Sequence, residues 1–156
     1  MKSRSNGSTS DPLSYAFRLL NLRGRSTKEL SFRLKLKGFS TEEIESTIEY
    51  LKNRGFIDDL ALARQLLDYG LNVKGYGIKG LRDFLRKRGI KEDQIRELLD
   101  DNLDEYPAAL KVATRALEKN KNRPKEVQKQ RIYGLLYRRG YSYDTIKRVL
   151  KELSID

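Results

Sequence analysis

A period of 51 residues is the feature that most constrains how this chain of 156 residues can fold. The segment LKLKGFSTEEI begins at Leu34, LRKRGIKEDQI begins at Leu85, and LYRRGYSYDTI begins at Leu136, so a leucine, a glycine and an isoleucine recur in register. An internal repeat of this length is typical of an array in which small supersecondary units stack on their neighbours. The sequence therefore predicts three copies of one unit.

Each copy predicts two helices joined at a glycine. Apolar residues at helical spacing precede Gly38, and glycine readily takes the left-handed conformation that ends a helix. Ser40 and Glu43 then form a capping-box pattern, which predicts the start of a second helix. Ser142 can cap the third copy in the same way, whereas Lys91 in the second copy cannot.

A further helix is expected before each of these pairs, near residues 12–22, 59–71 and 107–120. The three prolines of the chain fall where helices are expected to begin, a position at which the missing N–H costs nothing. No stretch alternates in the manner of a strand. We therefore predict an all-α fold in which three tandem three-helix repeats form an elongated, curved array. The predicted parts are a disordered tail (1–11) and repeats at 12–57, 58–105 and 106–156.

The composition excludes several kinds of site. The chain has no cysteine and no histidine, which rules out metal sites and nucleophile–base pairs built on those residues. No apolar run approaches the roughly 18 residues of a membrane span. The basic first ten residues lack the apolar core of a signal peptide. We expect a monomeric cytoplasmic protein with no cofactor and no membrane association.

The charge favours an anionic partner, although lysine-rich helix surfaces alone explain part of it. The chain carries 33 basic and 22 acidic side chains, a net charge of +11. By the same count the three predicted repeats carry +4, −2 and +8. The second repeat contains both the basic run Arg86–Arg88 and the acidic run Asp100–Glu105. A partner with mixed surface charge would suit this distribution better than a simple polyanion.

Two motifs invite catalytic or cofactor interpretations. GYGIKG, at Gly75–Gly80, matches the G-x-G-x-x-G pattern of dinucleotide sites, but no strand precedes it and no βαβ unit surrounds it. We expect instead a loop whose backbone approaches another group closely. Asp58 and Asp59 would need a pocket and a partner residue to act in acid–base chemistry. We expect one of them to cap the helix that begins near Leu60.

The paired helices also resemble helix-turn-helix units, whose second helix can enter a DNA groove. In the first copy that helix carries four glutamates within residues 42–49, the wrong sign for contact with phosphate. The third copy carries Lys147, Arg148 and Lys151 and suits nucleic acid better.

Basic clusters recur at one position in each repeat, the last turn before the glycine. They are Lys35–Lys37, Arg86–Arg88 and Arg138–Arg139. A cation there complements the helix dipole, which accounts for one basic residue per repeat but less well for a cluster. In register, the clusters would form a basic stripe suited to a repeating anionic track.

The third copy also carries three tyrosines close together. Tyr137 and Tyr143 could stack on nucleic-acid bases. Tyr141 aligns with Phe39 and Ile90, so we expect it to pack in a core.

Four segments are similar to the RecX family, bacterial regulators of the recombinase RecA. They are SYAFRLLNLRGRSTKEL (14–30), RGFIDDLALARQLL (54–67), KGYGIKGLRDFLRKRGI (74–90) and YRRGYSYDTIKRVL (137–150). The resemblance covers most of the chain outside the tail, and GFIDD is its most specific piece. Two positions depart from the family pattern. Tyr141 stands where phenylalanine is usual, and Leu62 stands where an aromatic residue is frequent.

The resemblance implies a regulator that is not an enzyme. Such proteins bind the RecA filament on single-stranded DNA and inhibit or modulate its strand exchange and ATP hydrolysis, and some bind bare DNA. We expect the basic stripe and the loop after each first helix to make the contact. The predicted contact residues are Arg23, Arg25, Lys35, Lys37, Arg86, Lys87, Arg88, Arg138, Arg139 and Arg148. The alternative is a general module for single- or double-stranded DNA with helix-turn-helix-like repeats.

Overall fold

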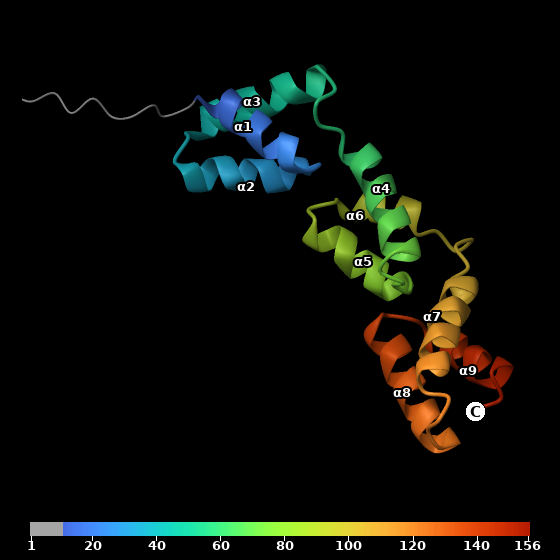
Figure 1. The fold of residues 1–156 in the computed structure, drawn as a ribbon. Coiled ribbons are helices and arrows are strands. Elements are labelled where there is room, and N and C mark those ends of the chain that lie inside the picture. Colours follow the sequence, from blue (N-terminus) through green and yellow to red (C-terminus); the bar gives the residue numbers. More distant parts are fainter. Residues whose placement is uncertain (1–10) are drawn as a thin grey trace, which may run out of the picture. The chain divides into compact units, whose positions relative to one another are not determined.

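The computed structural model describes residues 11–156, and within that range the chain forms nine α-helices and no β-strand (Figure 1). The prediction of an all-α fold is confirmed, while the predicted disordered tail lies outside the described residues except for Asp11. None of these helices has the length and apolar character that a membrane span requires. The helices are α1 (Pro12–Leu22), α2 (Thr27–Lys37), α3 (Thr41–Asn53), α4 (Asp59–Asn72), α5 (Ile78–Lys87), α6 (Glu92–Leu98), α7 (Tyr106–Lys119), α8 (Lys125–Arg138) and α9 (Tyr143–Glu152).

Side-chain caps explain where several helices begin. Ser26 and Ser40 form complete capping boxes at the N-termini of α2 and α3, each with the glutamate three residues further along the chain. The box at Ser40 confirms the prediction made from its sequence pattern. Ser142 Oγ accepts a hydrogen bond from the third residue of α9, also as predicted. Lys91 provides no side-chain cap to α6, which spans only 7 residues.

The predicted glycine turns are also present. Gly38, Gly89 and Gly140 follow α2, α5 and α8 and have φ angles of 98°, 81° and 86°. These left-handed conformations strain residues that carry a Cβ, so glycine ends each of the three helices at low cost.

The chain divides into two compact units, the first ending at Leu62. In the first unit α1, α2 and α3 lie against one another (Figure 1), and they enclose one apolar cluster. Its buried members are Ala16, Leu19, Leu30, Leu34, Ile48, Leu51 and Ile57.

The two adjacent aspartates at the start of α4 are structural. Asp58 Oδ1 accepts a hydrogen bond from the Ala61 N–H at 3.1 Å, which confirms the prediction that one aspartate caps this helix. Asp59 Oδ1 accepts hydrogen bonds from the Thr27 N–H at 2.8 Å and from the Thr27 hydroxyl at 3.2 Å. It thereby fixes the first residue of α2 to the start of α4. The sequence pattern does not predict this second role.

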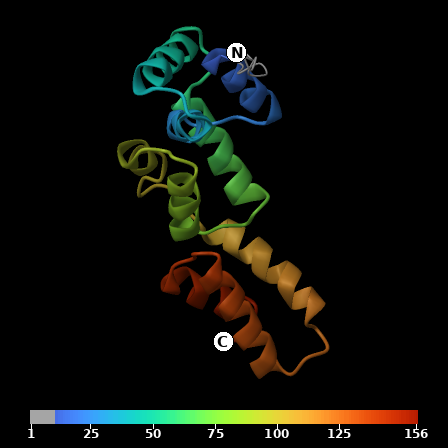
Figure 2. The ribbon, with the colours of Figure 1, turned by 90° about the vertical axis from the view of Figure 1, so that its left-hand side faces the viewer.

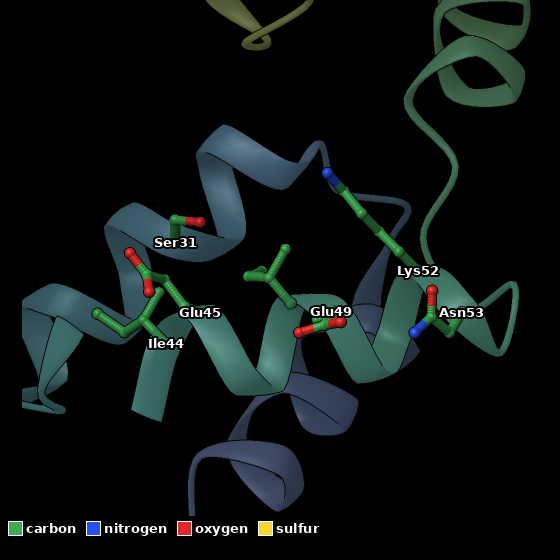
Figure 3. Close-up of a pocket in the computed structure, with 7 residues that line it drawn as sticks. Ser31, Ile44, Glu45, Glu49, Lys52 and Asn53 are labelled. Atoms are coloured by element: carbon green, nitrogen blue, oxygen red, sulfur yellow. The ribbon is translucent and has the colours of Figure 1, made fainter. Parts of the chain in front are cut away.

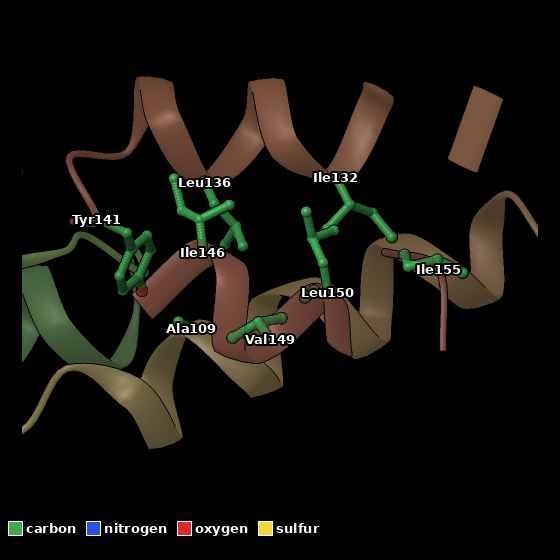
Figure 4. Close-up of a cluster of buried hydrophobic side chains, with 9 residues drawn as sticks. Ala109, Ile132, Leu136, Tyr141, Ile146, Val149, Leu150 and Ile155 are labelled. Atoms are coloured by element: carbon green, nitrogen blue, oxygen red, sulfur yellow. The ribbon is translucent and has the colours of Figure 1, made fainter. Parts of the chain in front are cut away.

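The second unit begins at Ala63 and contains the remaining length of the chain. Here α7, α8 and α9 enclose a cluster of their own, and α7 lies beside α8 in both ribbon views (Figures 1 and 2). Figure 4 shows Tyr141 at one end of this cluster and Ile155 at the other. The first and third repeats therefore each enclose an apolar core. Hydrogen bonds join the third repeat to the second.

The GYGIKG segment forms the loop before α5 and the first residues of that helix, and it lies directly against the glycine turn between α8 and α9. The Gly77 N–H donates to the Arg139 carbonyl at 2.8 Å, and the Lys79 N–H donates to the Gly140 carbonyl at 3.2 Å. A Cβ atom at Gly80 or Gly140 would collide with the backbone of the opposite segment. The predicted close approach of this loop is confirmed, and its target is another turn of the same chain.

Two side chains reinforce this junction from the third repeat. The Tyr141 hydroxyl donates to the Gly75 carbonyl at 2.8 Å, and the Arg139 guanidinium donates to the Lys74 carbonyl. Burial raises the pKa of Tyr141 to about 12, because a phenolate would lose its hydration there. Tyr141 is 4 % exposed, which confirms its predicted packing role.

Glu105, at the N-terminus of α7, connects the same two repeats. Its carboxylate accepts hydrogen bonds from the Ile78 N–H at the start of α5 and from the Ser142 N–H before α9, both at 2.8 Å. Burial is the largest single influence and acts to raise the pKa of Glu105, but the hydrogen bonds from the Ile78 and Ser142 backbone and from the Ser142 and Thr145 side chains together outweigh it, so the net pKa is lowered. One carboxylate thus lies at the N-termini of three helices, where the helix dipoles favour a negative charge.

Candidate nucleic-acid interface

Half of the predicted contact residues are exposed cations that form no ion pair within residues 11–156. This group contains Lys35, Lys37, Lys87, Arg138 and Arg148. Two of them lie over aromatic rings. Lys37 Nζ is 5.4 Å from the centroid of the Tyr15 ring, and the Arg148 guanidinium carbon is 4.1 Å from that of Tyr106. Such contacts hold a cation in place and leave its hydrogen-bond donors available.

Two further predicted residues are engaged by acidic side chains. Arg23 pairs with Glu29 at 3.1 Å. Arg86 pairs with Asp83 at 3.2 Å and donates a hydrogen bond to Glu92. The hydrogen bond to Glu92 raises the pKa of Arg86, and the same bond lowers the pKa of Glu92. An anionic partner would have to compete with these local carboxylates.

The remaining three predicted residues are less accessible. Arg25 is buried, with 8 % of its surface exposed, and Arg88 is half-buried. Arg139 is also half-buried, and its guanidinium binds the loop of the second repeat. That loop, Gly75–Gly80, is itself occupied by the glycine turn of the third repeat. Arg139 and this loop therefore have a structural role where sequence reasoning expected a partner contact.

A group that sequence reasoning only partly identified lies on the third repeat. Lys129, Tyr133 and Tyr137 are spaced four residues apart along α8, and Tyr143, Lys147 and Lys151 have the same spacing along α9. Residues four apart share a helix face, so each set forms a row. The sequence did contain a signal for these rows, because basic and aromatic residues recur at intervals of four at positions that are not part of the 51-residue glycine repeat.

A groove runs between these two rows, and we call it the α8–α9 groove. It is lined by Lys129, Tyr133, Tyr143, Lys147, Arg148 and Lys151, together with Leu150 and Asp156. Tyr143 is 61 % exposed and Tyr137, beside the groove, is 64 % exposed. These two tyrosines are available for stacking, which the sequence left open.

The first repeat carries a second groove of opposite sign, between α2 and α3. Figure 3 shows Glu45 and Glu49 on α3 with Ser31 on the neighbouring α2. Its lining also contains Ile44, Ile48, Lys52 and Asn53, so two carboxylates and one ammonium group give it a net negative charge. Within the described residues neither carboxylate forms an ion pair. The structure thus supports the inference that α3 of the first repeat is unsuited to contact with phosphate.

The fold and these surfaces define an all-helical repeat protein with an acidic groove on its first repeat and a basic, aromatic groove on its third. Among residues 11–156 there is no cluster of three or more histidine, cysteine, aspartate or glutamate side chains arranged to hold a metal ion.

Comparison with known proteins gives the family. Residues 13–51 match the model of the first three-helix domain of RecX, and residues 104–150 match that of its third. The regulatory protein RecX of Prosthecochloris aestuarii is 32 % identical over 151 residues, covering 96 % of this chain and 97 % of the relative. That of Legionella pneumophila is 34 % identical over 143 residues, covering 88 % and 91 %.

A solved structure supports the fold. The crystal structure of RecX from Lactobacillus salivarius superposes with a TM-score of 0.76 at 22 % identity, covering 93 % of this chain and 96 % of that one. The chain belongs to the RecX family of regulatory proteins, as its sequence segments predict.

Proposed function

We propose that this protein binds the filament that a RecA recombinase forms on single-stranded DNA and lowers its ATP hydrolysis and strand exchange. The observation that carries the proposal is the likeness to proteins named regulatory protein RecX over nearly the whole chain. The protein would act by binding and not by catalysis. It would work in the cytoplasm, where recombinational repair of DNA takes place.

The charge distribution supports a partner made of both protein and nucleic acid. Phosphates attract a basic surface, whereas basic patches on a protein attract an acidic one. The groove with Glu45 and Glu49 suits the second kind of contact, and the α8–α9 groove suits the first. A ligand of uniform negative charge would be repelled by the groove that contains Glu45 and Glu49.

The exposed cations of the last helical turn before each glycine are the proposed filament contacts. They are Lys35, Lys37, Lys87 and Arg138, and Arg148 extends the set on α9. Lys87 and Arg138 are the sharpest probes, because neither forms an ion pair within residues 11–156 and neither contributes a hydrogen bond to the junction of repeats two and three.

The test is ATP hydrolysis by a RecA recombinase on single-stranded DNA while this protein is titrated in. The wild-type protein should lower the rate, and a Lys87→Glu/Arg138→Glu variant should need at least about tenfold more protein for half-inhibition. Lys119→Glu/Lys125→Glu is the matched control, because it changes net charge equally at exposed sites outside the glycine turns. Wild-type protein that leaves hydrolysis unchanged would refute the proposal.

A second candidate is a general DNA-binding module, which the basic and aromatic α8–α9 groove favours. Binding to bare DNA as a function of salt distinguishes the two, because phosphate contacts give a steep dependence. Tight binding to bare DNA, with no effect on the recombinase beyond sequestering its DNA, would support this candidate.

A further inference from the structure

We propose that the α8–α9 groove is a binding site for single-stranded DNA, with bases stacked on its tyrosines and phosphates held by its lysines. The inference rests on the proposed function and deepens it. It assigns the DNA contact to a surface apart from the basic clusters that precede the glycines. Three features of the groove carry it.

The first feature is the exposure of aromatic rings. Tyr143 is 61 % exposed, and Tyr133, which faces the same groove, is 39 % exposed. The rings of Tyr133 and Tyr137 are parallel to within 8°, with centroids 6.2 Å apart, so they present ring surface along α8. Every nucleic-acid base has a flat face that can stack on such a ring, so the contact is tolerant of sequence.

The second feature is the set of cations beside those rings. Lys147 Nζ lies 5.4 Å from the centroid of the Tyr143 ring, and Lys129 and Lys151 lie further along the groove. None of these three lysines forms an ion pair in the part of the chain that the structure describes. They are therefore available to phosphates. Asp156 is the acidic residue of the lining.

The third feature is the order of residue types along the two helices. From the glycine turn outward, the row on α8 begins with Tyr137 and ends with Lys129. The row on α9 begins with Tyr143 and ends with Lys151. Rings thus lie toward the turn and charges toward the far ends, which suits a strand whose bases and phosphates point to different sides.

This arrangement favours single-stranded over duplex DNA. The bases of a duplex are paired and stacked within the helix, so their faces cannot reach the tyrosines. Only the lysines would contact a duplex, through its phosphates. The groove should therefore bind a single strand more tightly than a duplex of the same length.

The test is fluorescence anisotropy of a labelled oligothymidine, and of a duplex of equal length, with the full chain and no recombinase. Tyr133→Leu/Tyr143→Leu keeps the apolar surface but removes the rings. It should weaken single-strand binding by at least about fivefold for each base that loses its stacking partner and leave duplex binding unchanged. Because both side chains are partly exposed to solvent, the variant should fold like the wild type, and circular dichroism checks that it does.

Charge removal provides an independent measurement. Lys147→Gln/Lys151→Gln should reduce the slope of log affinity against log salt by about 1.4, at about 0.7 for each phosphate contact on a single strand. Lys119→Gln/Lys125→Gln removes the same charge from exposed sites outside the groove and should leave the slope close to that of the wild type.

The outcomes separate this inference from the proposed function. If the wild-type protein inhibits the recombinase but binds no bare oligothymidine, the inference that the α8–α9 groove binds single-stranded DNA is refuted and the proposed function stands. Equal affinity for single strand and duplex, or leucine variants that bind like the wild type, would overturn it as well. Binding that depends on the groove, without inhibition of the recombinase, would support the groove and refute the proposed function.

Discussion

Replacement of Glu105 by alanine should weaken the junction between the second and third repeats. The carboxylate accepts two backbone hydrogen bonds at 2.8 Å, from the N–H groups of Ile78 and Ser142. A hydrogen bond to a charged group contributes about 1.5–3 kcal/mol. The lower end applies, because alanine leaves room for water to reach both amides. The expected loss is therefore about 3 kcal/mol of unfolding free energy.

Urea denaturation and amide hydrogen exchange measure this loss. Glu105→Gln is the matched control, because it keeps the size of the side chain and one acceptor oxygen and should cost about half as much. In the alanine variant, exchange should accelerate at the Ile78 and Ser142 amides. A loss below about 0.5 kcal/mol, within the usual range of a neutral surface substitution, with unchanged exchange at both amides, would refute the assigned role.

The pH dependence of the Glu105 effect has a definite sign. The pKa of this carboxyl is lowered in the folded protein, so its stabilisation is present above the pKa of the unfolded chain. It is lost as the pH falls through the folded value. The difference in stability between wild type and Glu105→Ala should therefore shrink in acid. A difference that stays constant down to low pH would contradict the role of the ionised form.

Further predictions concern the glycine turn and the buried tyrosine. Gly140→Ala should destabilise the protein by several kcal/mol, because the new Cβ would collide with the backbone of Gly80 in addition to the strain at φ 86°. Gly38→Ala, at φ 98° in open space, should cost only about 1–2 kcal/mol by thermal denaturation, and equal losses would contradict the packing argument. Tyr141→Phe should cost about 1–2 kcal/mol by leaving the Gly75 carbonyl without its donor. In an ultraviolet titration Tyr141 should ionise near pH 12. The stability that its neutral form contributes to the folded protein should be present below the usual tyrosine pKa and be lost as the pH rises through about 12.

Much of the fold could be predicted because it depends on local interactions. A serine cap, a proline at a helix start and a glycine at a helix end act within a few residues of the chain. For that reason the sequence alone could predict the capping box at Ser40, the cap from Asp58 and the turn at Gly140. The division at residues 57 and 105 and the curvature of the array stay predictions.

The site was less predictable, because accessibility and pairing depend on contacts distant in sequence. Arg139 and Arg138 are adjacent and chemically alike, yet one binds the loop of the second repeat and the other is exposed. The alignment of the three repeats had placed both arginines in the same predicted basic stripe. The four-residue rows of the α8–α9 groove can be found in the sequence, but only the packing of the two helices brings them to one groove.

The sequence by itself therefore determined the repeat, the helices, the positions of their turns and the family. These follow from periodicity and from capping interactions that short segments contain. The tertiary structure alone decided what the glycine-rich loop touches, which arginines are withdrawn from solvent, and that Glu105 joins three helix N-termini. Those outcomes need atoms up to 66 residues apart to come within hydrogen-bond distance, as Tyr141 and Gly75 do.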